Sequence, residues 1–185
     1  MIRSARWEWL TVAPGLSGCG YGEPVSPNTG RALPGGGDGP MADIEEIRKL
    51  KARYFRLLDH QDWQGLSDVF APDAQIDVSS STVSGSGRGV YSSRDSFVDT
   101  VSKLLHGAVT VHHGHTEEIE LTGADSASGV WAMEDRIWFP ERSPVRTLWG
   151  AGWYEEEYER VDGRWRIKRM VLRRQRLELD GNPID

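Results

Sequence analysis

Three of the five histidines of this 185-residue chain lie within four residues, at His112, His113 and His115. Imidazole titrates near neutral pH, so a histidine that lines a pocket can take up or release a proton during a reaction. Apolar residues such as Val111 and Ile119 accompany the cluster and predict a β-strand. The chemistry that this stretch predicts is therefore proton transfer.

Strand alternation leaves the orientation of these histidines open. It places His113 and His115 on the face of the strand that carries the apolar residues, and His112 on the opposite face with Gly114. An isolated glycine in a strand often marks a bulge, and a bulge at Gly114 would shift the register of the strand. His112 therefore either points away from the core or is turned inwards by such a bulge.

A later stretch adds a carboxylate and a large aromatic side chain. Trp131, Met133, Asp135 and Ile137 share one strand parity, so Asp135 lies in apolar company. If this face is concave, Asp135 could assist as an acid or a second orienting group, and Trp131 could line a cavity for a flat hydrophobic molecule. With the opposite parity, Asp135 would be a solvated strand residue.

Composition argues against several classes of partner. Cys19 is the only cysteine, and without helix-spaced His/Glu pairs we expect no metal site. We expect no organic cofactor either, because no phosphate-binding glycine motif, nucleophile elbow or dinucleotide fingerprint occurs. The net charge of −6, with both signs interspersed, argues against nucleic acid. No apolar run approaches the roughly 20 residues that span a bilayer, so we expect no membrane partner. The residues before Cys19 lack the continuous apolar stretch of a secretory signal, and we therefore expect a cytoplasmic protein.

The first part of the chain divides at a change in composition. Residues 1–40 contain nine glycines and five prolines, and we expect a disordered leader because such a segment buries too little apolar area to offset its ordering entropy. The folded domain is expected at residues 41–185. A helix over residues 43–60 should carry Tyr54 in its apolar stripe and Asp59 at the border of that stripe. The charged residues that alternate with the apolar stripe, Lys51 among them, predict a solvated face.

Further elements follow from the period of the apolar residues. Asp62 is a predicted N-cap for a second helix, which Pro72 is expected to end. A short strand is expected at residues 74–78, and a third helix begins at Asp95. A Ser/Gly-rich loop is expected at residues 79–89. Beyond residue 107 the period becomes two, which predicts four antiparallel strands at residues 108–121, 127–139, 145–160 and 164–177. Helices followed by such a meander indicate an α+β domain, with helices covering one face of a curved sheet.

Three stretches of the sequence resemble the SnoaL-like branch of the nuclear transport factor 2 (NTF2) superfamily. They are residues 54–74, which contain YFRLLD and FAPDA, residues 111–121, which begin VHHGH, and residues 152–165, which contain GWYEEEYER and DGRW. The resemblance implies a cone-shaped α+β fold, in which three N-terminal helices pack on a strongly curved, mainly antiparallel sheet that encloses a pocket.

The resemblance also implies a catalytic pair. Scytalone dehydratase-like and lindane dehydrochlorinase-like members place an Asp at the end of the first helix and a His on the first long strand, and by motif these are Asp59 and His112. His112 would then transfer the proton, Asp59 would orient its ring, and Tyr54 would polarise the substrate. His113 is the alternative to His112 in the pocket.

The expected activity is that of a cofactor-independent lyase or isomerase acting on a small hydrophobic molecule. The alternatives are a module that binds a hydrophobic ligand without turnover and a module that serves oligomerisation. We expect a homodimer or homotrimer in any case, because long exposed strands with apolar residues require cover.

Overall fold

The structure, a computed structural model, describes residues 39–81 and 89–184. The predicted leader, up to residue 38, and residues 82–88 of the predicted Ser/Gly-rich loop lie outside the described residues. The chain divides into two units, residues 1–35 and 36–185, and every element below belongs to the second.

The helices form where the apolar stripes predict them. Asp62 caps the second helix by accepting a hydrogen bond from the backbone N–H of Gly65. Pro40 opens the first helix at a position that needs no N–H donor. The third helix is capped by Ser93. In the described ranges the α-helices are α1 (Pro40–Asp59), α2 (Trp63–Asp68) and α3 (Arg94–Leu104), and a short 3-10 helix spans Ser79–Ser81.

One mixed sheet holds the seven strands of the described residues. Its order is β2-β1-β6-β5-β4-β3, with β7 paired to β6. β1 runs parallel to β6, and the other paired strands are antiparallel. The strands are β1 (Phe70–Asp77), β2 (Val90–Tyr91), β3 (Val109–Leu121), β4 (Ser126–Trp138), β5 (Thr147–Val161), β6 (Arg164–Leu179) and β7 (Asn182–Pro183).

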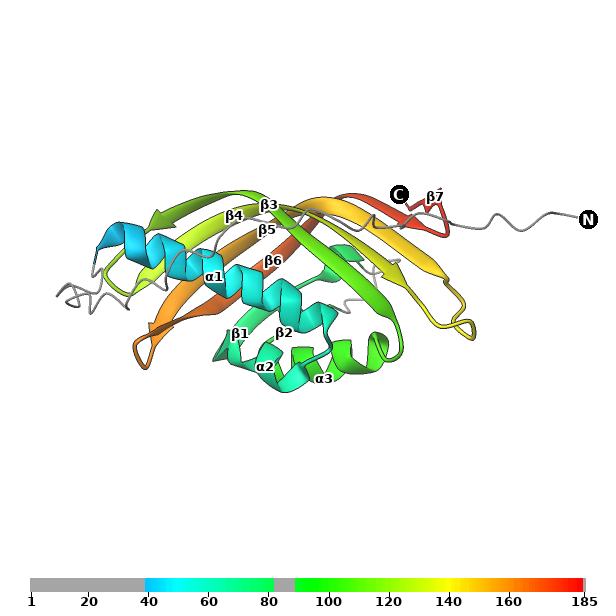
Figure 1. Ribbon diagram of the computed structural model, residues 1–185, viewed down its shortest axis with the longest axis horizontal. Helices are drawn as coiled ribbons and strands as arrows, with labels where there is room; N and C mark the ends of the chain where they lie inside the picture. The colour runs from blue at the N-terminus through cyan, green and yellow to red at the C-terminus, as the bar shows by residue number, and fades with distance from the viewer. Residues whose placement is uncertain (1–38, 82–88, 185) are drawn as a thin grey trace, which may run out of the picture. The chain divides into compact units, whose positions relative to one another are not determined.

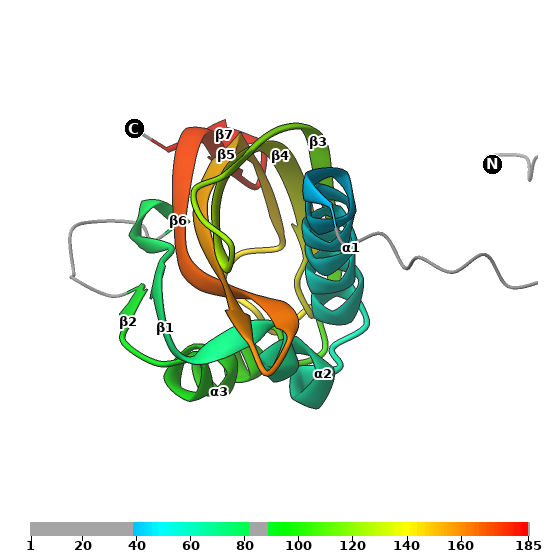
Figure 2. The ribbon, with the colours of Figure 1, turned by 90° about the vertical axis from the view of Figure 1, so that its left-hand side faces the viewer.

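The sheet is curled, and the helices lie on its concave side. Figure 1 shows α1 running beneath the sheet, with α2 and α3 below it. In Figure 2 the sheet turns from β3, beside α1, round to β6, β1 and β2, without closing. This arrangement confirms the predicted α+β fold with helices on a strongly curved sheet. The hydrophobic core fills the space between α1 and the sheet, and includes Ile47, Leu50, Tyr54 and Leu58.

Three details differ from the sequence prediction. Pro72 lies inside β1, at an irregularity of its pairing with β6, whereas we expected it to end the second helix. The strands β2 and β7 were not predicted, because two residues are too few to show an alternation of apolar and polar side chains. Lys51, predicted on the solvated face of α1, is completely buried. None of the helices in the described ranges is long and apolar enough to cross a membrane.

Candidate active site

A bulge in β3 turns His112 towards the core. The pairing of β3 with β4 shifts between Gly114 and Glu117, so the strand has one parity before the bulge and the other after it. Thr110 and His112 are buried, while the neighbouring Val109 is exposed. Of the two alternatives that the sequence left open, the bulge is therefore confirmed.

Asp59, the last residue of α1, accepts three hydrogen bonds from β3. The Nδ1 atom of His112 lies 2.6 Å from Asp59 Oδ1, and the backbone N–H of His112 donates to Oδ2 at 3.0 Å. The Thr110 hydroxyl donates to Oδ1 at 2.8 Å. Because a carboxylate only accepts, this geometry assigns a proton to Nδ1 and leaves the lone pair of a neutral ring on Nε2.

The electrostatics of Asp59 suit an orienting group. Burial works to raise the pKa of Asp59, but the hydrogen bonds from His112 and Thr110 outweigh it and hold the pKa below its ordinary value of 3.8. The carboxylate is therefore charged at neutral pH and can stabilise a positive charge on the ring. The His112 side chain is 6% exposed and that of Asp59 is 20% exposed, so solvent screens this pair only in part.

The second ring nitrogen of His112 faces another ion pair. His112 Nε2 lies 3.8 Å from Asp135 Oδ2. Arg174, on β6, holds Asp135 with two hydrogen bonds of 2.8 and 2.6 Å. Gly150, opposite Asp135 on β5, leaves room for the pair, because a Cβ there would lie 2.3 Å from Arg174 Nη1. The ring of His112 is thus flanked by two carboxylates, one of them bound by an arginine.

An aromatic ring covers His112 from the helix side. The ring of Phe55 is nearly parallel to that of His112, at 17°, with centres 6.5 Å apart. Gly114 permits this approach, since a Cβ at that position would lie 2.6 Å from Cε2 of Phe55. The glycine that accompanies the bulge therefore also makes space for the ring that packs on His112.

A second buried polar cluster forms around Lys51, which lies about two turns before Asp59 on α1. Lys51 Nζ lies 2.5 Å from Glu156 Oε1, and both side chains are 0% exposed. The Tyr158 hydroxyl donates to Glu156 Oε2 and accepts from Nε1 of Trp131. Burial lowers the pKa of Lys51, against the opposing influence of Glu156. The ammonium also lies 3.6 Å from the centre of the Tyr154 ring, and this cation–π interaction stabilises its charge in place of water.

Tyr54 lies between the two clusters. Burial raises the pKa of Tyr54 well above its ordinary value, and the neighbouring Tyr154 and the charges of Glu156 and Asp135 raise it further. Its hydroxyl is therefore neutral and able to donate a hydrogen bond. Its ring packs edge-on against Phe70 and Tyr154.

The structure brings some of the predicted site residues together and places the others elsewhere. The structure brings Asp59, His112 and Asp135 together, with Tyr54 close by. Trp131 is buried and belongs to the second cluster through Tyr158. The side chain of His113 is 59% exposed and lies 3.8 Å from Glu134, on the side of β3 opposite to His112.

Arg174 could not be recognised as a site residue from the sequence. No local motif marks this residue. A bulge in the β5–β6 pairing, between Ala151 and Gly152, interrupts the alternation of side chains between the two faces of the sheet, so the face on which Arg174 lies cannot be predicted from its neighbours in sequence. The signal that could have identified it is Gly150, a glycine that pairs across the strands with Asp135, a carboxylate that lies among apolar residues. In the described part of the chain, no three acidic, histidine or cysteine side chains come together to hold a metal ion.

Comparisons with known proteins agree with this architecture. Residues 40–171 match the model of the SnoaL-like domain family. Among curated proteins, the uncharacterized protein Rv2910c of Mycobacterium tuberculosis is 27% identical over 131 residues, which cover 71% of this chain and 84% of that protein.

Solved structures share the fold at low sequence identity. A type 2 hexachlorocyclohexane dehydrochlorinase (LinA) is similar with a TM-score of 0.64 and 20% identity, over 75% of this chain and 89% of that chain. A scytalone dehydratase-like protein from Novosphingobium aromaticivorans is similar with a TM-score of 0.63 and 20% identity, over 75% and 87% of the two chains. At such identity these likenesses establish the fold alone.

Proposed function

The chain belongs to the SnoaL-like domain family, and from this premise we propose that it is a cofactor-independent lyase or isomerase of the dehydratase type, acting on a small hydrophobic molecule. One observation carries the proposal: the His112 ring lies between Asp59, 2.6 Å from Nδ1, and Asp135, 3.8 Å from Nε2. A dehydrochlorinase and a scytalone dehydratase-like protein are among the structures that share the fold, which supports this class of reaction.

His112 is the proton-transfer group in this proposal. Its Nε2 takes a proton from a carbon next to the bond that breaks, and the electron pair of the C–H bond forms a double bond as hydroxide or chloride departs. When the leaving group is hydroxide, His112 transfers the proton to it, and the product that departs is water. Asp59 keeps the ring in the reactive tautomer and stabilises the imidazolium that forms.

The surrounding groups would bind and polarise the substrate. Asp135 adds a second negative charge near the imidazolium, and Arg174 offers a positive charge to a carbonyl oxygen or a departing anion. Tyr54, with its neutral hydroxyl, is proposed as a hydrogen-bond donor to a substrate carbonyl. Proton transfer of this kind requires neither a metal ion nor a nucleotide.

A comparison of two adjacent histidines tests the proposal. Wild type, His112→Ala and His113→Ala would be incubated in D2O with a panel of β-hydroxy ketones and chlorinated cyclohexanes, and products and deuterium uptake followed by proton NMR. We expect His112→Ala to lose about 10²- to 10⁴-fold in rate while remaining folded, and His113→Ala to keep its activity. Turnover at the wild-type rate by His112→Ala would remove the Asp59–His112 pair from consideration.

The hydrogen bond itself can be tested without a substrate. Nitrogen-15 NMR of the histidine rings should show the proton of neutral His112 on Nδ1 in the wild type, and Asp59→Asn should abolish this preference because an amide can donate to Nδ1. If the wild type binds a ring compound without turnover, and Asp59→Asn and His112→Ala bind it equally well, the protein is a binding module instead.

A further inference from the structure

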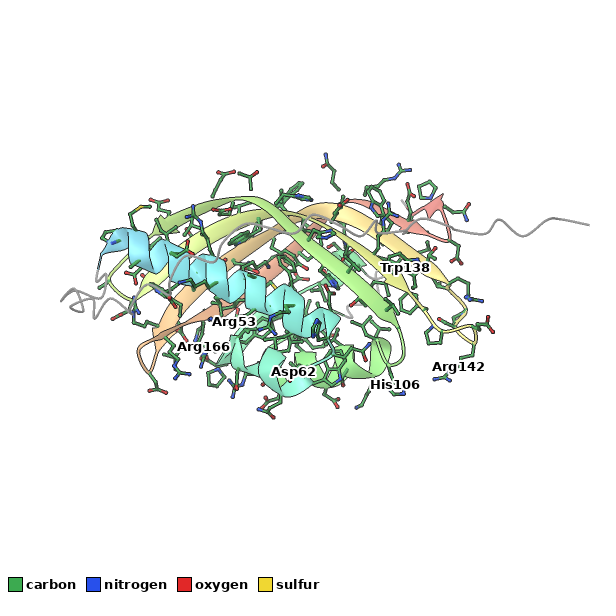
Figure 3. All side chains as sticks on the ribbon, viewed as in Figure 1. Arg53, Asp62, His106, Trp138, Arg142 and Arg166 are labelled. Atoms are coloured by element: carbon green, nitrogen blue, oxygen red, sulfur yellow. The ribbon has the colours of Figure 1, made fainter. Side chains whose placement is uncertain are left out.

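Four arginines meet outside the candidate active site. Arg53 and Arg56 lie one turn apart on α1 and are exposed. Arg164 and Arg166 begin β6, and all four line one hollow of about 590 Å³ together with residues of α2. Figure 3 shows Arg53 and Arg166 next to each other, below α1.

The hollow is strongly positive although the whole chain is acidic. Five arginines line it against two carboxylates, those of Glu46 and Asp68, whereas the chain has a net charge of −6. The fifth arginine, Arg160, is already paired with Asp43 and Asp125. Within residues 39–81 and 89–184, the other four arginines form no ion pair with a carboxylate.

The gathering of these cations is unfavourable for the folded protein by itself. Burial lowers the pKa of Arg166, and the like charges of Arg164, Arg53 and Arg94 lower it further, while Asp68 opposes them. Guanidinium groups remain protonated at physiological pH, so the consequence is electrostatic repulsion within the hollow. A bound anion would relieve this repulsion.

We propose that this hollow binds a small molecule through a multiply charged oxyanion, such as a phosphate group. Guanidinium groups bind phosphate oxygens through paired, charge-assisted hydrogen bonds. The volume lies within the range of roughly 300 to 1,000 Å³ that is usual for small-molecule sites. Among the described residues that line the hollow, none belongs to the group of His112, Asp59, Asp135 and Arg174, so the proposal is independent of the proposed activity.

Calorimetric titration with pyrophosphate and with inorganic phosphate, at about 20 mM salt, tests the site. The variants are Arg53→Gln and Arg166→Gln, with Arg142→Gln as the control, since Arg142 is an exposed arginine in the β4–β5 connection (Figure 3). We expect each variant in the hollow to bind pyrophosphate at least about tenfold more weakly than the wild type, and Arg142→Gln to bind it equally well. Thermal melts confirm that all variants are folded.

Further binding measurements distinguish a soluble phosphorylated molecule from a lipid headgroup as the source of the oxyanion. If pyrophosphate binds but vesicles containing a phosphoinositide do not, the ligand is a soluble phosphorylated molecule, and binding of both points to a lipid headgroup. The proposal is overturned if Arg53→Gln and Arg166→Gln bind pyrophosphate as the wild type does, or if neither phosphate nor pyrophosphate binds at about 10 mM. Binding of a DNA oligomer alone would also overturn it.

Discussion

Replacing Lys51 by methionine should destabilise the domain far more than its position on a charged helix suggests. The substitution keeps an unbranched side chain of similar length and removes the ammonium. It leaves the Glu156 carboxylate at 0% exposure with only the Tyr158 hydroxyl as a hydrogen-bond donor. A buried charge without its partner loses the attraction that offset its desolvation.

The magnitude follows from this burial. Breaking a buried ion pair by removing one partner costs about 3 to 5 kcal/mol, a large part of the roughly 5 to 15 kcal/mol that separates folded from unfolded domains. For a domain of this size, each kcal/mol shifts the melting temperature by about 2 to 4 °C. Lys51→Met should therefore melt about 6 to 20 °C below the wild type.

Lys49→Met is the matched control. Lys49 lies on the same helix, is 55% exposed, and pairs with Glu46 at 3.4 Å on the surface. Its loss should change the free energy of unfolding by no more than about 1 kcal/mol. The double variant Lys51→Met/Glu156→Gln should recover much of the lost stability, because the neutral amide oxygen still accepts from Tyr158 and no charge is stranded.

Urea unfolding followed by circular dichroism, with thermal melts as a second measurement, gives these free energies. If Lys51→Met is no less stable than Lys49→Met, the buried ion pair does not exist in solution. If the double variant is as unstable as Lys51→Met alone, the loss comes from packing, and the reasoning from an uncompensated charge is wrong.

Two further predictions concern the candidate active site. Gly150→Ala would place a Cβ 2.3 Å from Arg174 Nη1, so Arg174 must move from Asp135. Because both side chains of this pair are buried, we expect the melting temperature to fall as well. At a temperature where the variant is still folded, kcat/KM should fall at least about tenfold, and unchanged kinetics would show that the Arg174–Asp135 pair does not serve the reaction. Because the pKa of Asp59 is lowered in the folded state, its contribution to stability is present above its ordinary value of 3.8 and is lost as the pH falls through the lower folded value. The wild type should therefore lose urea stability more steeply below about pH 4 than Asp59→Asn, and parallel curves for the two proteins would contradict the lowered pKa.

The local elements and the Asp59–His112 pair could be predicted because they follow from periodicity and motif. The apolar stripe of α1 and the alternation of the strands depend on neighbouring residues. The family resemblance identifies Asp59 and His112, whose contact joins residues 53 positions apart. The oligomeric state, the cytoplasmic location, the hydrophobic ligand and the disordered leader remain predictions.

The buried charges could not be predicted in the same way. Lys51 occurs among charged residues at helical spacing, a pattern typical of a solvated face, and its partner Glu156 lies 105 positions further on. A charged lysine is stable inside a core only when such a partner offsets its desolvation, and no local window of sequence contains both. The same holds for Arg174, whose partner Asp135 lies on another strand.

The bulge in β3 also makes the strand tolerant of a change in length at one point. Between Gly114 and Glu117 the strand advances three residues while β4 advances two, from Met133 to Trp131. Deleting either His115 or Thr116 would therefore restore an unbroken ladder and leave both faces of the strand as they are. A one-residue deletion elsewhere in β3 would exchange the faces on one side of it. We therefore expect insertions and deletions among family sequences to be accepted at residues 115–116 and rejected in the rest of the strand.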